Sequence, residues 1–243
     1  MQRIDLNCDL GEGAGHDAEL MPFVTSANIA CGGHAGDAAS MRAAVDLARK
    51  HGVAIGAHPG FADREHFGRR ELPLTPAQAR ELVAALAAIA RQAGARLAHV
   101  KPHGALYNQA ARDAALAAAV ADAVHAAGPE LALFGLAGSQ LLAAAQARGL
   151  RAVSEGFADR TYLPDGTLTP RSRPDALIQE EDDAVAQVLR LVREGRVRTP
   201  GGRDVAVRAD TVCVHGDGPH AVAFARRLHA ELARAGVTLA PPA

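Results

Sequence analysis

Polar residues alternate with apolar ones near the start of the chain. Asp5, Asn7 and Asp9 occupy every second position of an otherwise apolar segment. Successive side chains of a β-strand point to opposite faces, so these three would share one face. Buried carboxylates and amides are costly unless they bind a partner or a ligand. The spacing therefore indicates a polar site inside a sheet-based fold, where acid-base chemistry could take place.

The same alternation recurs on later segments and at several strand ends. The later segments carry His99, Lys101 and His103, and then Cys213, His215 and Asp217. Further polar residues close other strand-like segments: Asn28, Cys31, His58 and Glu155. Ligand sites of α/β barrels and open α/β sheets lie at the carboxyl ends of the strands. A single buried His, or a pair such as Lys101 with Asp5, is often only structural, but the whole set of buried charges is costly and predicts an active site.

Short β-rich segments alternate with amphipathic helical segments along the chain. Seven strands are expected, at about 3–9, 25–31, 53–57, 97–101, 131–136, 151–155 and 211–215. Helical spacing of apolar residues is clearest in the segments 41–48, 185–192 and 221–228. Another helix begins with a capping box from Thr75 to Gln78 and ends at Gly94. This alternation predicts parallel βαβ units, either closed into a barrel or doubly wound as an open sheet.

Length and composition indicate one globular domain that spans residues 1–243, with a β-hairpin inserted near 195–207. Lys and Arg total 26 against 27 Asp and Glu, without a basic run, so no nucleic-acid partner is expected. No apolar stretch reaches the roughly 20 residues that a membrane helix needs, so the protein should be soluble. The three cysteines form no CxxC pair and no signal segment precedes the first strand, which favours reduced thiols in the cytoplasm.

Several sequence blocks resemble the LamB/YcsF family, in the same order along the chain. They are DLNCDLGE at 5–12, ANIACGGHAGD at 27–37, GAHPG at 56–60, FGRR at 67–70, VKPHGALYN at 100–108, EGFADR at 155–160 and VHGD at 214–217. The resemblance implies an α/β fold, a single-domain, incomplete seven-stranded β/α (TIM-like) barrel of the glycoside hydrolase/deacetylase kind. It also implies ATP-dependent 5-oxoprolinase activity, which opens 5-oxoproline to L-glutamate and releases ADP and phosphate. Mg²⁺ with the ATP, and the partner 5-oxoprolinase subunits B and C, are implied in the same way.

Under that activity, several members of the polar cluster have hypothetical roles. Lys101 would attract the substrate carboxylate or the transferring phosphoryl group, with Asn28 and His103 as hydrogen-bond donors. The base that activates water would be Asp9 or His215, with Asp217 orienting His215 or holding a cation. The residues expected to bind substrate are Asp5, Asn7, Asn28, His34, His58, Glu155, Arg69 and Arg160. The sequence has no Walker-type phosphate loop and no Gly-x-Gly-x-x-Gly turn before a helix, so it does not locate ATP.

Alternatives from other functional classes stay open at this point. A metal-dependent amidohydrolase or deacetylase acting alone would draw its ligands from Asp9, His34, His58, His103 and His215. No HxH or HExxH spacing supports a metal directly. A binding subunit without catalytic function would instead present 5-oxoproline to partners that carry out phosphoryl transfer and hydrolysis. Metal content would test the first alternative, and ligand binding by the isolated chain would indicate the second.

Overall fold

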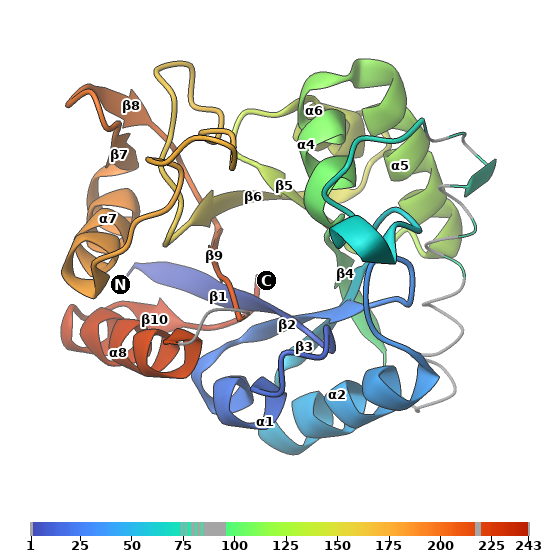
Figure 1. Cartoon of the computed structure of the whole chain (residues 1–243), viewed down its shortest axis with the longest axis horizontal. Coiled ribbons are helices and arrows are strands. Elements are labelled where there is room, and N and C mark those ends of the chain that lie inside the picture. Colours follow the sequence, from blue (N-terminus) through green and yellow to red (C-terminus); the bar gives the residue numbers. More distant parts are fainter. Residues whose placement is uncertain are drawn as a thin grey trace.

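Seven parallel strands close into a barrel in this computed structural model, which describes residues 2–73, 75, 77, 78, 81, 84, 96–216 and 220–242. The strands are β1 (Arg3–Leu10), β2 (Ser26–Ala30), β3 (Ala54–His58), β4 (Leu97–Val100), β5 (Ala132–Leu136), β6 (Arg151–Phe157) and β9 (Thr211–Val214). They pair in that order, and β9 returns to β1, with Asp5 opposite Thr211. This closure confirms the predicted seven-stranded barrel and excludes an open, doubly wound sheet (Figure 1).

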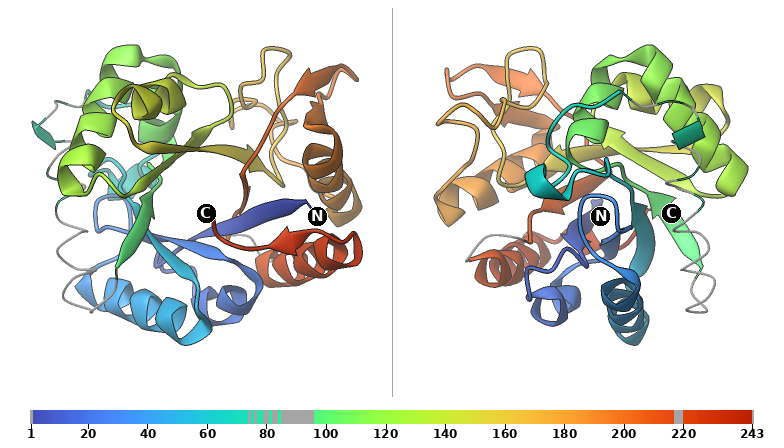
Figure 2. Two further views of the ribbon diagram at one scale, coloured as in Figure 1. Left: turned by 180° about the vertical axis from the view of Figure 1, so that it is seen from behind. Right: turned by 45° about the vertical axis from the view of Figure 1, so that its right-hand side comes forward.

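The last strand of the chain pairs with the first strand. β10 (Thr238–Leu239) pairs with the start of β1, whereas β9 pairs with the residues of β1 that follow. The first and last strands of the chain therefore lie side by side (Figure 2). A short antiparallel hairpin, formed by β7 (Arg196–Arg198) and β8 (Asp204–Ala206), precedes β9 and lies outside the barrel (Figure 1).

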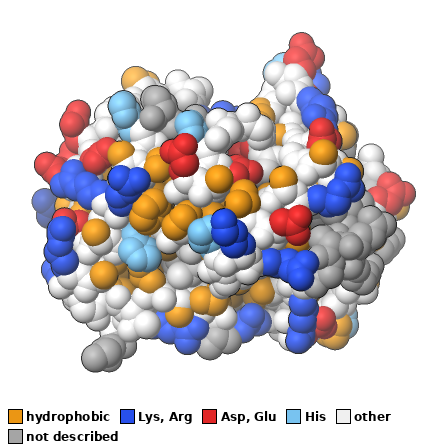
Figure 3. Space-filling model, turned by 90° about the horizontal axis from the view of Figure 1, so that it is seen from below, with side chains coloured by type: hydrophobic (Ala, Val, Ile, Leu, Met, Phe, Trp, Pro, Cys, Tyr) orange, Lys and Arg blue, Asp and Glu red, His pale blue; other side chains and the backbone are white. Residues whose placement is uncertain are grey.

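Amphipathic helices cover the outside of the barrel (Figure 1). They are α1 (Asp17–Leu20), α2 (Ala38–His51), α4 (Gly104–Arg112), α5 (Ala114–Ala127), α6 (Gln140–Ala147), α7 (Glu181–Glu194) and α8 (Ala221–Arg234), with the 3-10 turns η1 (Met21–Phe23) and η2 (Arg64–His66). The apolar faces predicted for α2, α7 and α8 are buried, among them Met41, Val188 and Leu228. Figure 3 looks onto the side of α1, α2 and α8, where side chains of both charge signs surround apolar ones.

The helix predicted from Thr75 to Gly94 lies largely outside the described residues. Its capping box is present, because Thr75 N donates to Gln78 Oε1 at 2.8 Å and Gln78 N donates to Thr75 Oγ1 at 3.3 Å. Residues 77, 78, 81 and 84 are helical. Among the helices that the structure describes, none has both the length and the apolar character needed to cross a membrane.

The two faces of β1 have opposite environments, as the alternation predicts. Leu6 and Cys8 belong to the main hydrophobic core. Asp5 and Asn7 are just as deeply buried, but they make hydrogen bonds to polar side chains of other barrel strands. The barrel interior is therefore polar along β1, and every inward side chain on this strand needs a partner there.

A histidine fills the interior beside a glycine. A Cβ atom on Gly56 of β3 would lie 2.0 Å from His99 Nε2, so only glycine leaves room for this ring. The His99 ring stacks on Phe134 with 4.1 Å between ring centroids, and its Nε2 lies 2.7 Å from Asn28 Oδ1. The ring is thus fixed on one side by packing and on the other by a hydrogen bond.

Acid should destabilise the protein in part through His99. Burial, with the nearby Lys101 charge, lowers the pKa of His99 to about 3. Below the ordinary histidine pKa of about 6.5, the unfolded chain binds a proton that the folded chain does not. The free energy of unfolding therefore decreases as the pH is lowered, by up to about 1.4 kcal/mol per pH unit. Urea denaturation between about pH 6 and about pH 4.5 should show a smaller loss for His99→Gln than for the wild type. His51→Gln, at the exposed end of α2, is the control, and equal slopes in all three proteins would contradict this prediction.

Candidate active site

The carboxyl ends of the barrel strands surround a cavity of about 1060 Å³. Several residues predicted to carry chemistry line it: Asp9, His58, Lys101, His103 and His215. They belong to β1 and β3 or directly follow β4 and β9, strands that lie close together in the closed barrel. The structure therefore brings this part of the predicted cluster together at the edge where α/β barrels bind their ligands.

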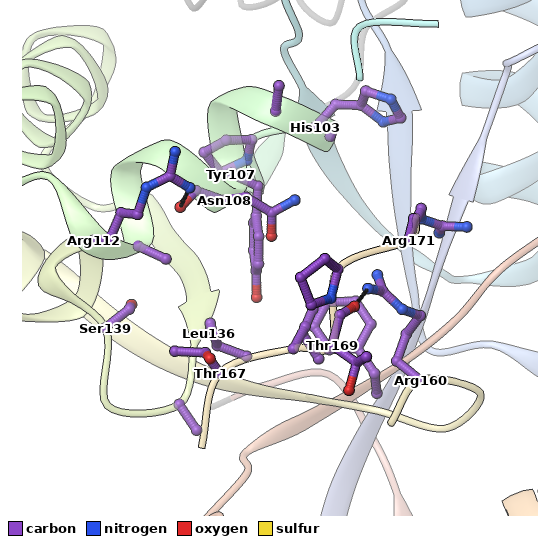
Figure 4. A pocket seen from close by; sticks show the side chains of 18 of the residues that line it. His103, Tyr107, Asn108, Arg112, Leu136, Ser139, Arg160, Thr167, Thr169 and Arg171 are labelled. Atoms are coloured by element: carbon purple, nitrogen blue, oxygen red, sulfur yellow. Dashed lines mark hydrogen bonds between the residues drawn. The ribbon is translucent and has the colours of Figure 1, made fainter. Parts of the chain in front are cut away.

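Arginine side chains also line the cavity. Figure 4 shows Arg160 and Arg171, from the segment after β6, facing the cavity that Tyr107 of α4 also lines. Arg160 is buried and donates to the carbonyl oxygen of Thr169 at 2.7 Å. Burial, together with the Arg171 charge, lowers the pKa of Arg160 to about 10, so this side chain remains a cation at neutral pH. Arg69, a predicted substrate-binding residue, also lines the cavity, and the structure adds Tyr107 and Arg171 to the predicted set.

A buried ammonium group lies at the centre of the polar cluster. Lys101 Nζ is 2.9 Å from Asp9 Oδ1, 3.0 Å from Glu155 Oε1, 3.0 Å from Cys213 Sγ and 3.1 Å from Asn7 Oδ1. Burial alone would lower the pKa of Lys101, but the surrounding Asp9, Cys213 and Glu155 raise it well above its usual value. Lys101 is therefore a fixed positive charge at the cavity.

Two buried amides hold this charge cluster in place. Asn28 Nδ2 donates to Asn7 Oδ1 at 2.7 Å and to Asp9 Oδ1 at 2.9 Å. Asn7 Nδ2 donates to Glu155 Oε1 at 3.0 Å and to Thr211 Oγ1 at 2.7 Å. An amide nitrogen carries only two hydrogens, so Asn28 has none left for a substrate oxygen, which differs from its predicted role as a donor. Asn7, Asn28 and Glu155 are not part of the cavity wall and instead position Lys101 and Asp9.

Asp5 is satisfied by hydroxyl groups rather than by a cation. Its Oδ1 accepts from Ser26 Oγ at 2.8 Å and from Thr25 Oγ1 at 2.5 Å, and its Oδ2 accepts from Thr211 Oγ1 at 2.5 Å. Burial raises the pKa of Asp5, and these hydroxyl groups oppose that rise. Asp5 is absent from the cavity wall, so the structure gives this predicted substrate-binding residue no direct access to a ligand there.

Asp9 combines exposure to the cavity with a strongly favoured negative charge. Burial alone would raise the pKa of Asp9, but the adjacent His58 and Lys101 hold it well below its usual range. Asp9 Oδ2 lies 3.2 Å from His58 Nε2. Burial would lower the pKa of His58, and this carboxylate raises it instead. Asp9 is therefore ionised, as a base that activates water must be.

A carboxylate missed by the sequence analysis joins three imidazoles beside Asp9. Glu12 Oε1 lies 2.9 Å from His34 Nε2, 3.4 Å from His103 Nδ1 and 3.8 Å from His58 Nε2. Glu12 follows β1 in the Gly-rich turn, where the alternation of a strand no longer predicts side-chain direction. These four residues could hold a metal ion, as could Asp9, Cys213 and His215, whose ligand atoms also lie within 4.8 Å of one another.

His103 is held as a neutral ring whose proton is already in use. Burial, with the nearby His58 and His34, lowers the pKa of His103 far below its ordinary value. Its Nε2 lies 2.9 Å from the carbonyl oxygen of Phe67, so this nitrogen carries the hydrogen. The nitrogen that faces the cluster, Nδ1, is then an acceptor. The predicted role of His103 as a donor to substrate therefore does not fit this geometry.

Asp159 orients the ring of His215. His215 Nδ1 lies 2.8 Å from each carboxylate oxygen of Asp159, and Arg171 Nη2 donates to His215 Nε2 at 2.9 Å. Burial would raise the pKa of Asp159, but His215 lowers it below its usual value. Asp217, the residue predicted for this orienting role, lies outside the described residues. Asp159 provides the carboxylate that an Asp–His pair requires.

The chain is similar to known proteins over almost its whole length. The A subunit of 5-oxoprolinase from Bordetella pertussis is 56% identical in an alignment that covers 97% of each chain. The crystal structure of a lactam utilization protein from Thermus thermophilus has a TM-score of 0.90 at 46% identity and covers 98% of this chain and 99% of that one. A peptidoglycan deacetylase from Bacillus subtilis shares the fold alone, with a TM-score of 0.54, 11% identity and coverage of 98% and 87%. Residues 4–243 match the LamB/YcsF family, and the chain belongs to this family.

Proposed function

We propose that this chain is the A subunit of an ATP-dependent 5-oxoprolinase, which cleaves 5-oxoproline to L-glutamate and releases ADP and phosphate. The name of the Bordetella relative supports the substrate and the membership of a larger enzyme. The observation that carries the proposal is the buried Lys101 ammonium beside the ionised Asp9 at the cavity, with 2.9 Å between their charged atoms. This pair combines a cation for an anionic substrate with a base for water.

The proposed chemistry follows from the stability of a lactam. A lactam carbonyl is a poor electrophile, and transfer of a phosphoryl group to its oxygen would activate the carbonyl carbon for attack by water. Lys101 would attract the substrate carboxylate or the phosphoryl group, and Asp9 would accept a proton from the attacking water. His215, oriented by Asp159, is the second candidate for the base. Asn7, Asn28 and Glu155 act by positioning Lys101 and Asp9.

We propose that ATP, with Mg²⁺, acts in an assembly with partner subunits B and C. The arginines at the cavity wall support a phosphoryl group entering there, since guanidinium groups bind phosphate oxygens well: they are Arg69, Arg112, Arg160 and Arg171. We place the assembly in the cytoplasm, in keeping with three cysteines that form no disulfide.

The test is the release of glutamate and phosphate from 5-oxoproline and ATP by this chain alone, by its partners alone and by the full mixture. We expect activity only in the full mixture. Release of glutamate by the chain alone without ATP would support a metal-dependent amidohydrolase instead, the alternative that the Glu12 and histidine cluster favours. If the catalytic step stays unchanged in cavity variants that bind 5-oxoproline less tightly, the chain is a binding subunit.

A further inference from the structure

Two buried imidazoles, His58 and His103, face each other through nitrogen atoms that carry no hydrogen when both rings are neutral. His58 Nδ1 lies 2.8 Å from the carbonyl oxygen of Lys101, and His103 Nε2 lies 2.9 Å from that of Phe67. A carbonyl oxygen can only accept, so these two nitrogens carry the ring hydrogens. In neutral rings, the remaining nitrogens, His58 Nε2 and His103 Nδ1, present lone pairs to each other at 2.9 Å. Two lone pairs repel at this distance unless a proton or a metal cation lies between them.

A carboxylate and a third imidazole converge on the same point. Glu12 Oε1 is 3.4 Å from His103 Nδ1 and 2.9 Å from His34 Nε2, and the ligand atoms of all four residues lie within 4.8 Å of one another. Nitrogen and oxygen ligands of a tetrahedral zinc ion, each about 2.0 to 2.1 Å from the metal, lie about 3.3 Å apart. The measured separations between these ligand atoms, from 2.9 to 3.8 Å, lie on both sides of that value. A single proton on His58 would bridge only two of these atoms, whereas a metal ion would bind all four.

The surrounding backbone is built tightly around these rings. A Cβ atom on Gly60 would lie 2.6 Å from His34 Nδ1, and one on Gly68 would lie 2.7 Å from His34 Cβ. Phe67 has a φ of 53°, a left-handed backbone conformation that residues other than glycine rarely adopt. Its carbonyl oxygen accepts from His103, and its ring packs edge-on against His34 and His103. Such strained residues persist where their surroundings fix them, and they cluster at functional sites.

We propose that Glu12, His34, His58 and His103 bind one divalent transition metal ion of the zinc class. Imidazole nitrogens favour zinc and its neighbours, whereas Mg²⁺ prefers oxygen ligands and keeps its water, so this site differs from that of any magnesium that accompanies ATP. Both His58 and His103 donate a hydrogen bond from their second ring nitrogen to a backbone carbonyl oxygen, as metal-binding histidines usually do. Glu12, His58 and His103 also line the cavity, so the metal would face the substrate side.

Metal content tests this proposal without any substrate. The full chain is purified without a polyhistidine tag or chelator and analysed by inductively coupled plasma mass spectrometry. We expect about one equivalent of transition metal per chain in the wild type, and at least about tenfold less in Glu12→Gln and His103→Gln. His51→Gln, at the exposed end of α2, is the matched control and should retain the metal. Co²⁺ added to the stripped wild-type protein should give the visible absorption bands of tetrahedral cobalt.

Two results would contradict the proposed metal site. A folded wild-type protein that remains metal-free after dialysis against zinc, and shows no cobalt bands, would mean that a proton on His58 occupies this position. Full metal content in both Glu12→Gln and His103→Gln would also overturn the proposal. Thermal unfolding establishes that each variant is folded, and His34→Gln replaces any that is not. Because no substrate enters the measurement, its outcome is independent of the 5-oxoprolinase assignment, which rests on glutamate release.

Discussion

Replacing Lys101 by Met is expected to abolish 5-oxoproline-dependent turnover and to lower the free energy of unfolding by about 3 to 5 kcal/mol. Lys101 Nζ lies 2.9 Å from Asp9 and 3.0 Å from Glu155, and its side chain is 3% exposed. Without the ammonium group, two buried carboxylates would lie close together with no cation between them, which is the costly way to break a buried ion pair. Urea denaturation at neutral pH measures the stability, and glutamate release by the full mixture measures turnover.

A double variant separates the structural role of Lys101 from its chemical role. Lys101→Met with Glu155→Gln removes one buried carboxylate together with the cation, so part of the lost stability should return. Turnover should remain absent, since neither of the two replacement side chains can supply the positive charge. If the double variant regained both stability and turnover, Lys101 would serve only to stabilise the barrel interior.

Asp9→Asn is expected to lower kcat by about 10² to 10⁴, the usual contribution of a positioned base. The carboxylate is held ionised by His58 and Lys101, and an amide of the same shape cannot accept a proton from water. The fold should be retained, because the amide oxygen can still accept from Asn28 and Lys101. Steady-state glutamate release gives kcat and KM, and thermal unfolding checks the fold.

Asp46→Asn, on the exposed side of α2, is the matched control for this substitution and should behave as the wild type. A full kcat in Asp9→Asn would remove Asp9 as the base and leave His215 with Asp159 as the candidate. A reduced kcat in both Asp9→Asn and Asp46→Asn would instead indicate a general effect of the lost charge.

The alternation in the first strand predicted much of the fold because it reflects a local geometric rule. Leu6 and Cys8 pack in the core while Asp5 and Asn7 point to the polar interior, as period-two spacing requires. The closure of the sheet could not be predicted in the same way. It depends on pairing between β1 and β9, with Asp5 opposite Thr211, and no local pattern encodes a contact across so much intervening chain.

The sequence predicted site residues on strands better than those in turns. Lys101 and Asp9 were found because strand spacing gives their direction, whereas Glu12 follows Gly11, whose φ of 72° redirects the chain. Asp159 follows a strand end, where its charge is as compatible with a solvated loop as with a site, and only the structure pairs it with His215. Strand geometry therefore predicts side-chain direction, while a turn has no such periodic rule.

The hydrogen-bond partners of the site residues were also beyond the sequence. Asn28 and His103 are polar and correctly placed near the site, but their hydrogens are used by Asn7, Asp9 and Phe67. Residue type therefore predicts what a side chain can donate, while only interatomic distances determine whether the hydrogen is still available to a ligand.

Glutamate release by the full mixture, when only this chain is exchanged, tests most directly whether the lactam is opened with the help of the Lys101 charge. The wild-type chain is compared with the double variant Lys101→Met/Glu155→Gln, after urea denaturation has established that the variant is folded. Glutamate should be released from 5-oxoproline and ATP with the wild type, and none above background with the variant. Undiminished release with the folded variant would contradict the role of Lys101, because the lactam would then be opened without its charge.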